Sequence, residues 1–147
     1  MTTTLAEILL VEDNPADRDL TIDALAHSHW PSNISAVSDG AEALAFLRRE
    51  GKYAAATRPN LVLLDLNLPR KDGRAVLADV KSDPALRRIP VVIFSTSQAP
   101  LDIERCYELK ANSYVSKPST LRDWMAAVKV VNEFWLGCAC LPREEEQ

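Results

Sequence analysis

The sequence predicts an α/β protein built from repeated βα units, with a doubly wound parallel sheet covered by helices on both faces. Three runs of strand length are continuously apolar, at residues 8–11, 61–64 and 91–94. Continuous apolar runs are typical of strands that are buried on both faces. Each run precedes a helical pattern, and strands that alternate with helices predict parallel pairing through right-handed crossovers.

Turn and cap residues supply the other boundaries. Asn14-Pro15 begins the first helix, because proline is tolerated in a first turn, and Thr120 is the expected N-cap of the last helix. The predicted strands are 8–12, 34–37, 61–65, 91–95 and 113–116. The predicted helices are 15–29, 41–49, 74–82, 101–110 and 120–135, with a loop at 51–59.

Size and charge restrict the class of protein. The 147 residues suit one domain with a real core. The balance of 17 basic and 21 acidic residues argues against nonspecific binding to nucleic acid, which needs clustered positive charge. The sequence contains neither an apolar stretch of about 20 residues nor a signal-peptide pattern. We therefore expect a cytoplasmic protein with no nucleic-acid or membrane partner.

Polar side chains follow the apolar runs at the points where the predicted strands end. They are Glu12, Asp13, Asp65, Asn67, Ser95, Thr96 and Lys117. Taken singly, each has a simpler explanation as a helix cap or a solvated loop residue. Ligands of open parallel sheets bind beyond the carboxyl ends of the strands, so together these residues predict one pocket. The pocket suits a divalent cation and a phosphoryl group on an aspartate.

Five motifs, in order and at matching spacing, resemble the receiver domain of two-component response regulators over about residues 6–134. The motifs lie at residues 11–14, 39–44, 63–69 with Gly73, 90–96 and 114–118. The resemblance implies a flavodoxin-like (βα)5 fold with strand order 2-1-3-4-5. It divides the chain into a receiver domain at 1–134 and a C-terminal extension at 135–147. Loop 51–60 and the aromatic tail are more specifically similar to single-domain regulators that partner bacterial and cyanobacterial phytochrome kinases.

The resemblance implies that Asp65 accepts a phosphoryl group from a histidine kinase, so that the protein is a phosphoacceptor and not an enzyme. Glu12, Asp13 and Asp65 would crowd three negative charges, which a magnesium ion relieves. Asp13, Asp65 and the backbone carbonyl of Asn67 would bind Mg²⁺ directly, and Glu12 would hold a water molecule.

The remaining site residues would act on the transferred group and on the response to it. Lys117 would bind a phosphoryl oxygen, and Ser95, with Thr96 beside it, would supply a hydroxyl donor. Movement of Ser95 toward the phosphate would let Tyr114 follow, which would alter contacts with an unknown downstream protein. Lys110 stands where the family commonly has glycine, and this substitution predicts a remodelled end of the fourth helix.

Two other functions remain possible at this point. A dehalogenase-like phosphatase also uses an aspartate nucleophile and Mg²⁺, but it needs a second aspartate as general acid where this chain has Asn67. The second alternative is a receiver-like interaction module that is never phosphorylated. Such modules usually lose acidic or lysine positions, and here all of them are present.

The last predicted helix carries apolar residues on two faces, which is more than packing on the sheet requires. One explanation is a tail that folds back on its own domain. The other is a homodimer through the face formed by residues 100–140, with Trp124, Phe134 and Trp135 as anchors. We expect the homodimer.

Overall fold

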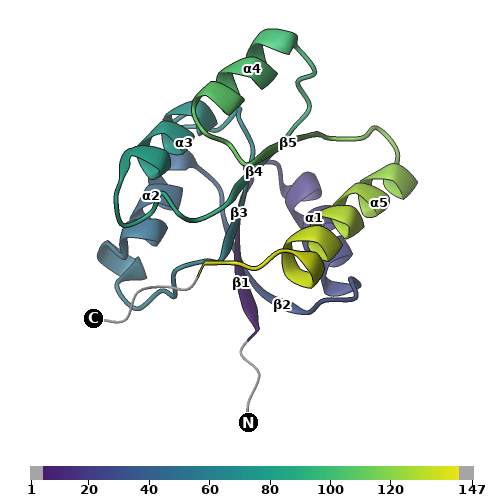
Figure 1. Ribbon diagram of the computed structural model, residues 1–147, viewed down its shortest axis with the longest axis horizontal. Coiled ribbons are helices and arrows are strands. Elements are labelled where there is room, and N and C mark those ends of the chain that lie inside the picture. The colour runs from purple at the N-terminus through teal and green to yellow at the C-terminus, as the bar shows by residue number, and fades with distance from the viewer. Residues whose placement is uncertain (1–4, 143–147) are drawn as a thin grey trace.

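A five-stranded parallel sheet in the order β2-β1-β3-β4-β5 runs through the middle of the molecule (Figure 1). The computed structural model describes residues 5–142, so part of the extension predicted at 135–147 lies outside the described residues. The flavodoxin-like fold and the strand order are as predicted. The strands are β1 (Ala6–Val11), β2 (Ser32–Val37), β3 (Leu61–Leu64), β4 (Val91–Ser95) and β5 (Ser113–Ser116).

Helices cover both faces of the sheet, with α1 and α5 on one face and α2, α3 and α4 on the other (Figure 1). The helices are α1 (Pro15–Ala26), α2 (Gly40–Arg48), α3 (Gly73–Ser82), α4 (Pro100–Glu108) and α5 (Leu121–Asn132). None of the helices within residues 5–142 combines the length and the apolar character that crossing a bilayer requires.

Alternate side chains of the central strands enter two separate cores. Ile8 and Leu10 of β1 pack beneath α1 and α5, whereas Leu9 and Val11 pack beneath α2 and α3. Successive side chains of a strand point to opposite faces, so a strand buried on both faces needs apolar residues at every position. This is why the apolar runs located the central strands correctly.

The first helix ends at Ala26, three residues before the predicted end at 29. The side chains just beyond it bond to its last carbonyl groups. His27 Nδ1 lies 2.9 Å from the carbonyl oxygen of Asp23, and the Ser28 hydroxyl donates to that of Ala24 at 2.8 Å. The Ser28 N–H has turned to the Leu25 carbonyl, so the Ser28 hydroxyl takes its place at the Ala24 carbonyl and the helix ends.

The last helix also ends early, at Asn132, and continues as a π-helical segment, η2 (Glu133–Cys138). The Asn132 side chain is fully buried, donates to the carbonyl of Trp30 at 2.9 Å, and accepts from its N–H at 3.3 Å. Gly137 lies against the indole ring of Trp30, because a Cβ at position 137 would be 2.3 Å from Trp30 Nε1. The tail is therefore pinned to the turn between α1 and β2.

Lys110 keeps a left-handed backbone conformation, with φ of 75°, at the end of α4. The N–H groups of Lys110 and Ala111 donate to the carbonyls of Tyr107 at 3.0 Å and Cys106 at 2.9 Å, which closes the helix. The expectation of a remodelled helix end is therefore wrong. The lysine adopts the conformation that glycine would adopt, at a cost of roughly 1–2 kcal/mol.

Replacing Lys110 by glycine should therefore stabilise the protein. We expect Lys110→Gly to raise the free energy of unfolding by about 1 kcal/mol, because glycine adopts positive φ without steric cost. Urea unfolding followed by circular dichroism measures the change. Glu104→Gly, an exposed position inside α4, should instead lower that free energy by about 0.5–1 kcal/mol. Equal effects in the two variants would contradict the assigned backbone strain.

Candidate phosphoacceptor site

The carboxyl ends of the strands bring a buried lysine into contact with three carboxylates. Lys117 Nζ lies 2.6 Å from Glu12 Oε1, 2.9 Å from Asp65 Oδ2 and 3.0 Å from Asp17 Oδ2. The Lys117 side chain is only 2% exposed. Glu12, Asp65 and Lys117 each directly follow a strand, namely β1, β3 and β5, as the sequence predicted. Asp17 comes from α1 and was not predicted.

Three carboxylates at this edge are close enough to bind one metal ion. Glu12, Asp13 and Asp65 each place one oxygen so that all three oxygens lie within 4.8 Å of one another. Asp13 is exposed to solvent, and so is Asn67, two residues after Asp65 in the chain. Mg²⁺ prefers oxygen ligands and retains several water molecules, so a partly open cluster of carboxylates fits it.

Burial and charge set the protonation of this group. Burial raises the pKa of Glu12 to about 7, the hydrogen bond to Lys117 opposes the rise, and the negative charge of Asp65 adds to it. Burial alone would lower the pKa of Lys117, but hydrogen bonds to Glu12, Asp65 and Asp17 outweigh burial and raise it. The ammonium group therefore stays charged at neutral pH and is a fixed cation beside Asp65.

The loop after β3 holds Asp65 through backbone contacts. Asp65 Oδ1 accepts a hydrogen bond from the N–H of Leu66 at 2.7 Å, and the N–H of Gly73 donates to the Leu66 carbonyl at 2.8 Å. A Cβ on Gly73 would lie 2.2 Å from the Asp65 carbonyl oxygen. Only glycine at position 73 permits this close approach, which fixes the loop that carries the phosphoacceptor candidate.

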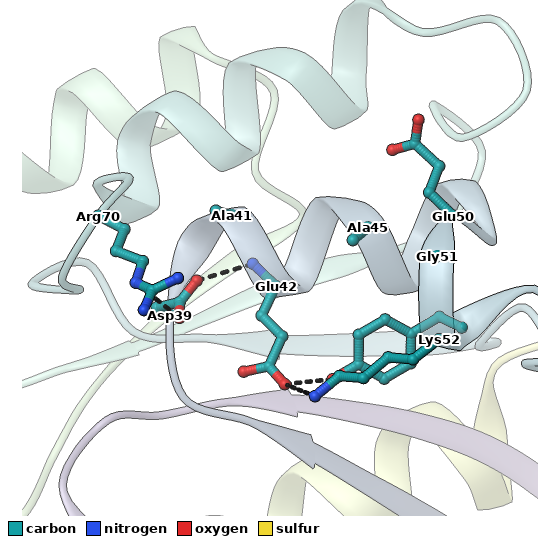
Figure 2. A pocket seen from close by; sticks show the side chains of 9 residues that line it. Asp39, Ala41, Glu42, Ala45, Glu50, Gly51, Lys52 and Arg70 are labelled. Atoms are coloured by element: carbon teal, nitrogen blue, oxygen red, sulfur yellow. Dashed lines mark hydrogen bonds and ion pairs between the residues drawn. The ribbon is translucent and has the colours of Figure 1, made fainter.

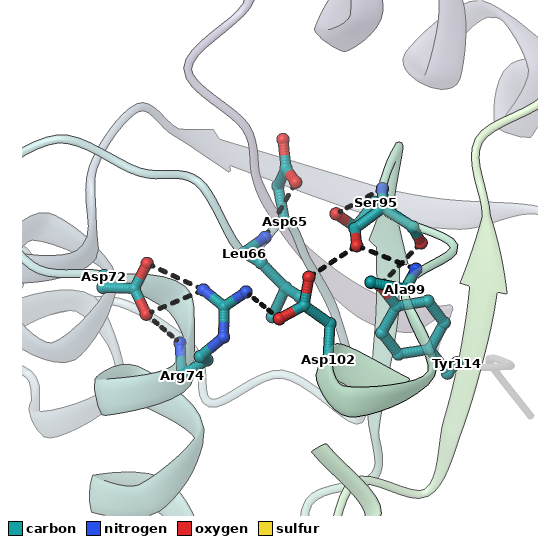
Figure 3. Close-up of polar contacts among 9 residues, drawn as sticks. Asp65, Leu66, Asp72, Arg74, Ser95, Ala99, Asp102 and Tyr114 are labelled. Carbon is teal, nitrogen blue, oxygen red and sulfur yellow. Dashed lines mark hydrogen bonds and ion pairs between the residues drawn. The ribbon is translucent and has the colours of Figure 1, made fainter. Parts of the chain in front are cut away.

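The two predicted switch residues meet through a third residue. Ser95 is buried, and its hydroxyl oxygen accepts from the N–H of Ser97 at 3.4 Å. The Tyr114 hydroxyl donates to the carbonyl of Ser97 at 2.8 Å (Figure 3). Thr96, between Ser95 and Ser97 in the chain, is exposed to solvent. Ser97 therefore contacts both predicted switch residues.

A polar network that the sequence did not predict continues from Ser97. The Ser97 hydroxyl donates to Asp102 Oδ2 at 2.5 Å, and Arg74 Nη2 donates to Asp102 Oδ1 at 2.8 Å (Figure 3). Arg74 also contacts the Asp72 carboxylate, which caps α3. The loop after β4 is thus tied to the first turns of α3 and α4. The contact between Arg74 and Asp102 joins residues 28 positions apart, so no local pattern identified it.

An open groove of about 520 Å³ lies beside α2 and the short 3-10 segment η1 (Gly51–Tyr53), and its lining does not include Glu12, Asp13 or Asp65. Charged pairs line it: Arg70 with Asp39 at 3.7 Å, and Lys52 with Glu42 at 3.3 Å (Figure 2). The Tyr53 hydroxyl donates to Glu42, which lowers the pKa of that carboxyl. None of the predicted site residues lines this groove.

Comparison with known proteins identifies the family. The family model for the response regulator receiver domain matches residues 8–129. The chain belongs to the response regulator receiver family. Members of this family are phosphoacceptors of two-component signalling, generally without enzymatic activity, and bind Mg²⁺ or Mn²⁺ at an acidic site.

Several solved relatives of this receiver chain are phytochrome or bacteriophytochrome response regulators. The response regulator Rcp1 of Synechocystis sp. is 46% identical over 135 residues, which span 92% of each chain. The phosphorylated cyanobacterial phytochrome response regulator RcpA is 53% identical with a TM-score of 0.92, covering 95% of this chain and 100% of that chain. The Mn²⁺-bound form of Rcp1 is 45% identical with a TM-score of 0.90, covering 94% and 99%.

The predicted interface residues of this receiver occupy different environments. Trp124 is wrong as an anchor, because it is 6% exposed, packs on Phe94 with 5.1 Å between ring centroids, and donates to Thr21. Trp135 is half-buried against the same core. Phe134 is 50% exposed. Of the three predicted anchors, Phe134 and the exposed part of Trp135 are therefore the ones accessible to another molecule.

Proposed function

We propose that this protein is a response regulator that accepts a phosphoryl group on Asp65 from a histidine kinase of the phytochrome type in the cytoplasm. It signals through phosphorylation-dependent contacts with a downstream protein. The main support is the position of Asp65, whose carboxylate lies 2.9 Å from a buried ammonium group and within a cluster of carboxylates. The phytochrome assignment is supported by the similarity to RcpA, a cyanobacterial phytochrome response regulator.

The chemistry follows from the groups around Asp65. A carboxylate oxygen of Asp65 attacks phosphorus, the bond from phosphorus to the kinase histidine nitrogen breaks, and the imidazole leaves with that electron pair. Lys117 holds a phosphoryl oxygen, and the Ser95 hydroxyl donates to another. Asp13, Asp65 and the Asn67 carbonyl would bind Mg²⁺ directly and Glu12 would hold a water molecule, and the bound cation would supply positive charge against the crowded carboxylates.

The alternative is a receiver-like module that is never phosphorylated. With acetyl phosphate and Mg²⁺, we expect the wild type to gain one acid-labile phosphoryl group, detected by intact mass. Asp65→Asn should gain none, because an amide is not a competent nucleophile. The control, Asp19→Asn, removes the same charge at an exposed position of α1 and should be labelled normally. A wild type that stays unlabelled would support the alternative, and label retained in Asp65→Asn would refute the assigned residue.

The metal assignment predicts opposite effects of one substitution on binding and on stability. Asp13→Ala should lose Mg²⁺ binding and phosphorylation, because a direct ligand is removed. Without metal it should unfold at higher urea, because the repulsion among Glu12, Asp13 and Asp65 is relieved. Titration calorimetry and urea unfolding with and without Mg²⁺ measure the two effects. Unchanged Mg²⁺ affinity in this variant would contradict the site.

We also propose a twofold homodimer through the face formed by residues 100–140, now with Phe134 as the main anchor and Trp135 beside it. Val130 and Phe134 lie one helical turn apart, and each exposes at least half of its surface. The rings of Phe134 and Trp135 meet edge to face at 5.1 Å. An exposed aromatic next to exposed aliphatic surface is typical of an interface.

Substitution of the anchor tests the dimer without removing the tail. We expect the wild type to be dimeric by light scattering at tens of micromolar and Phe134→Ser to be monomeric, because a buried aromatic anchor contributes about 2 kcal/mol or more. Leu5→Ser, a comparable loss of exposed apolar surface at the start of β1, should leave the dimer intact. A monomeric wild type at that concentration would refute the dimer.

A further inference from the structure

Every N–H group of the Lys117 ammonium already has a carboxylate acceptor. A lysine ammonium has three N–H donors. Glu12, Asp65 and Asp17 each offer an oxygen within 3.0 Å of Lys117 Nζ. A phosphoryl group on Asp65 would bring new oxygens to a donor whose capacity is full, so the existing contacts must rearrange.

Asp17 differs from the other two acceptors. Its side chain is 26% exposed, against 3% for Glu12 and 10% for Asp65, and its contact with the lysine is the longest of the three. It lies in the first turn of α1, where its N–H is held by the Asn14 side chain at 3.0 Å. Its backbone is therefore fixed, while its carboxylate can return to water at a favourable helix N-terminus.

We infer that Asp17 is a positioning residue that restrains Lys117 in the unphosphorylated protein and gives it up to the incoming phosphoryl group. This inference rests on the proposed phosphorylation of Asp65. The phosphoryl group carries up to about two negative charges and would share one ammonium with the Asp17 carboxylate. Removing Lys117 from Glu12 instead is the more costly rearrangement, because the Glu12 side chain is only 3% exposed and water cannot replace the lost contact as it can at Asp17.

The charge of Asp17 thus favours the unphosphorylated state. Asp17→Asn keeps the size and an oxygen acceptor but removes the charge that competes for Lys117. We expect it to bind beryllofluoride, a mimic of the phosphoryl group, about fivefold more tightly, the value of a partly exposed ion pair. The rate of phosphorylation at saturating acetyl phosphate should also be higher in Asp17→Asn than in the wild type.

The experiment compares wild type, Asp17→Asn and Asp17→Ala with Asp19→Asn, all at saturating Mg²⁺ so that metal affinity does not enter. Asp19 is an exposed aspartate two residues along the same helix, so it matches the change of charge without contact to Lys117. Beryllofluoride affinity is measured by fluorescence titration, and the acetyl phosphate rate is resolved into its maximal value and its half-saturation concentration.

Tighter beryllofluoride binding in both Asp17 variants, with Asp19→Asn unchanged, is the expected result. Unchanged or weaker binding in the Asp17 variants, or an equal gain in Asp19→Asn, would overturn the inference while a labelled wild type leaves the phosphoacceptor assignment intact. A wild type that binds no beryllofluoride and gains no phosphoryl group would overturn both. A purely structural role for Asp17 would lower the free energy of unfolding without tightening beryllofluoride binding.

Discussion

The rest of the site depends on one buried cation, the ammonium group of Lys117, which is surrounded by the carboxylates of Glu12, Asp17 and Asp65. Glu12 and Asp65 are buried together and need the positive charge beside them, and the buried ammonium group needs these carboxylates. Lys117 and its carboxylate partners are consequently held together by electrostatic attraction as well as by packing. A phosphoryl group on Asp65 would add negative charge next to Lys117. The side chains that share the ammonium group would then have to shift.

The parallel sheet makes this arrangement possible. Five strands end at one edge, so residues more than 100 positions apart, such as Glu12 and Lys117, meet there with rigid backbone behind them. The two cores leave the strands no freedom to slide, because both faces are filled by apolar side chains. The loops at the carboxyl ends of the strands, including the segment after β4, are not constrained in this way.

The sequence predicted the central strands, and it predicted that Glu12, Asp13, Asp65 and Lys117 lie close together, because apolar runs and strand ends are local signals. It placed the start of β2 two residues late, since Ser32 and Asn33 are polar at a sheet edge. It missed Asp17, although a carboxylate one helical turn after Asp13 was a usable sign. It misjudged Trp124, because both faces of α5 are apolar and periodicity cannot tell which face meets the sheet.

The contact of Asn132 and Gly137 with Trp30 joins the last segment of the chain to the outermost strand region. Amide groups of residues 133–139 should therefore exchange with solvent by the same opening event as those near the start of β2, and not by fraying from the end. The segment that carries Phe134 is consequently held in place on both sides, by the contacts of Asn132 and Gly137 with Trp30. The position of Phe134 therefore depends on the turn between α1 and β2. A change in the length of the turn around Trp30 would change the direction in which Phe134 points.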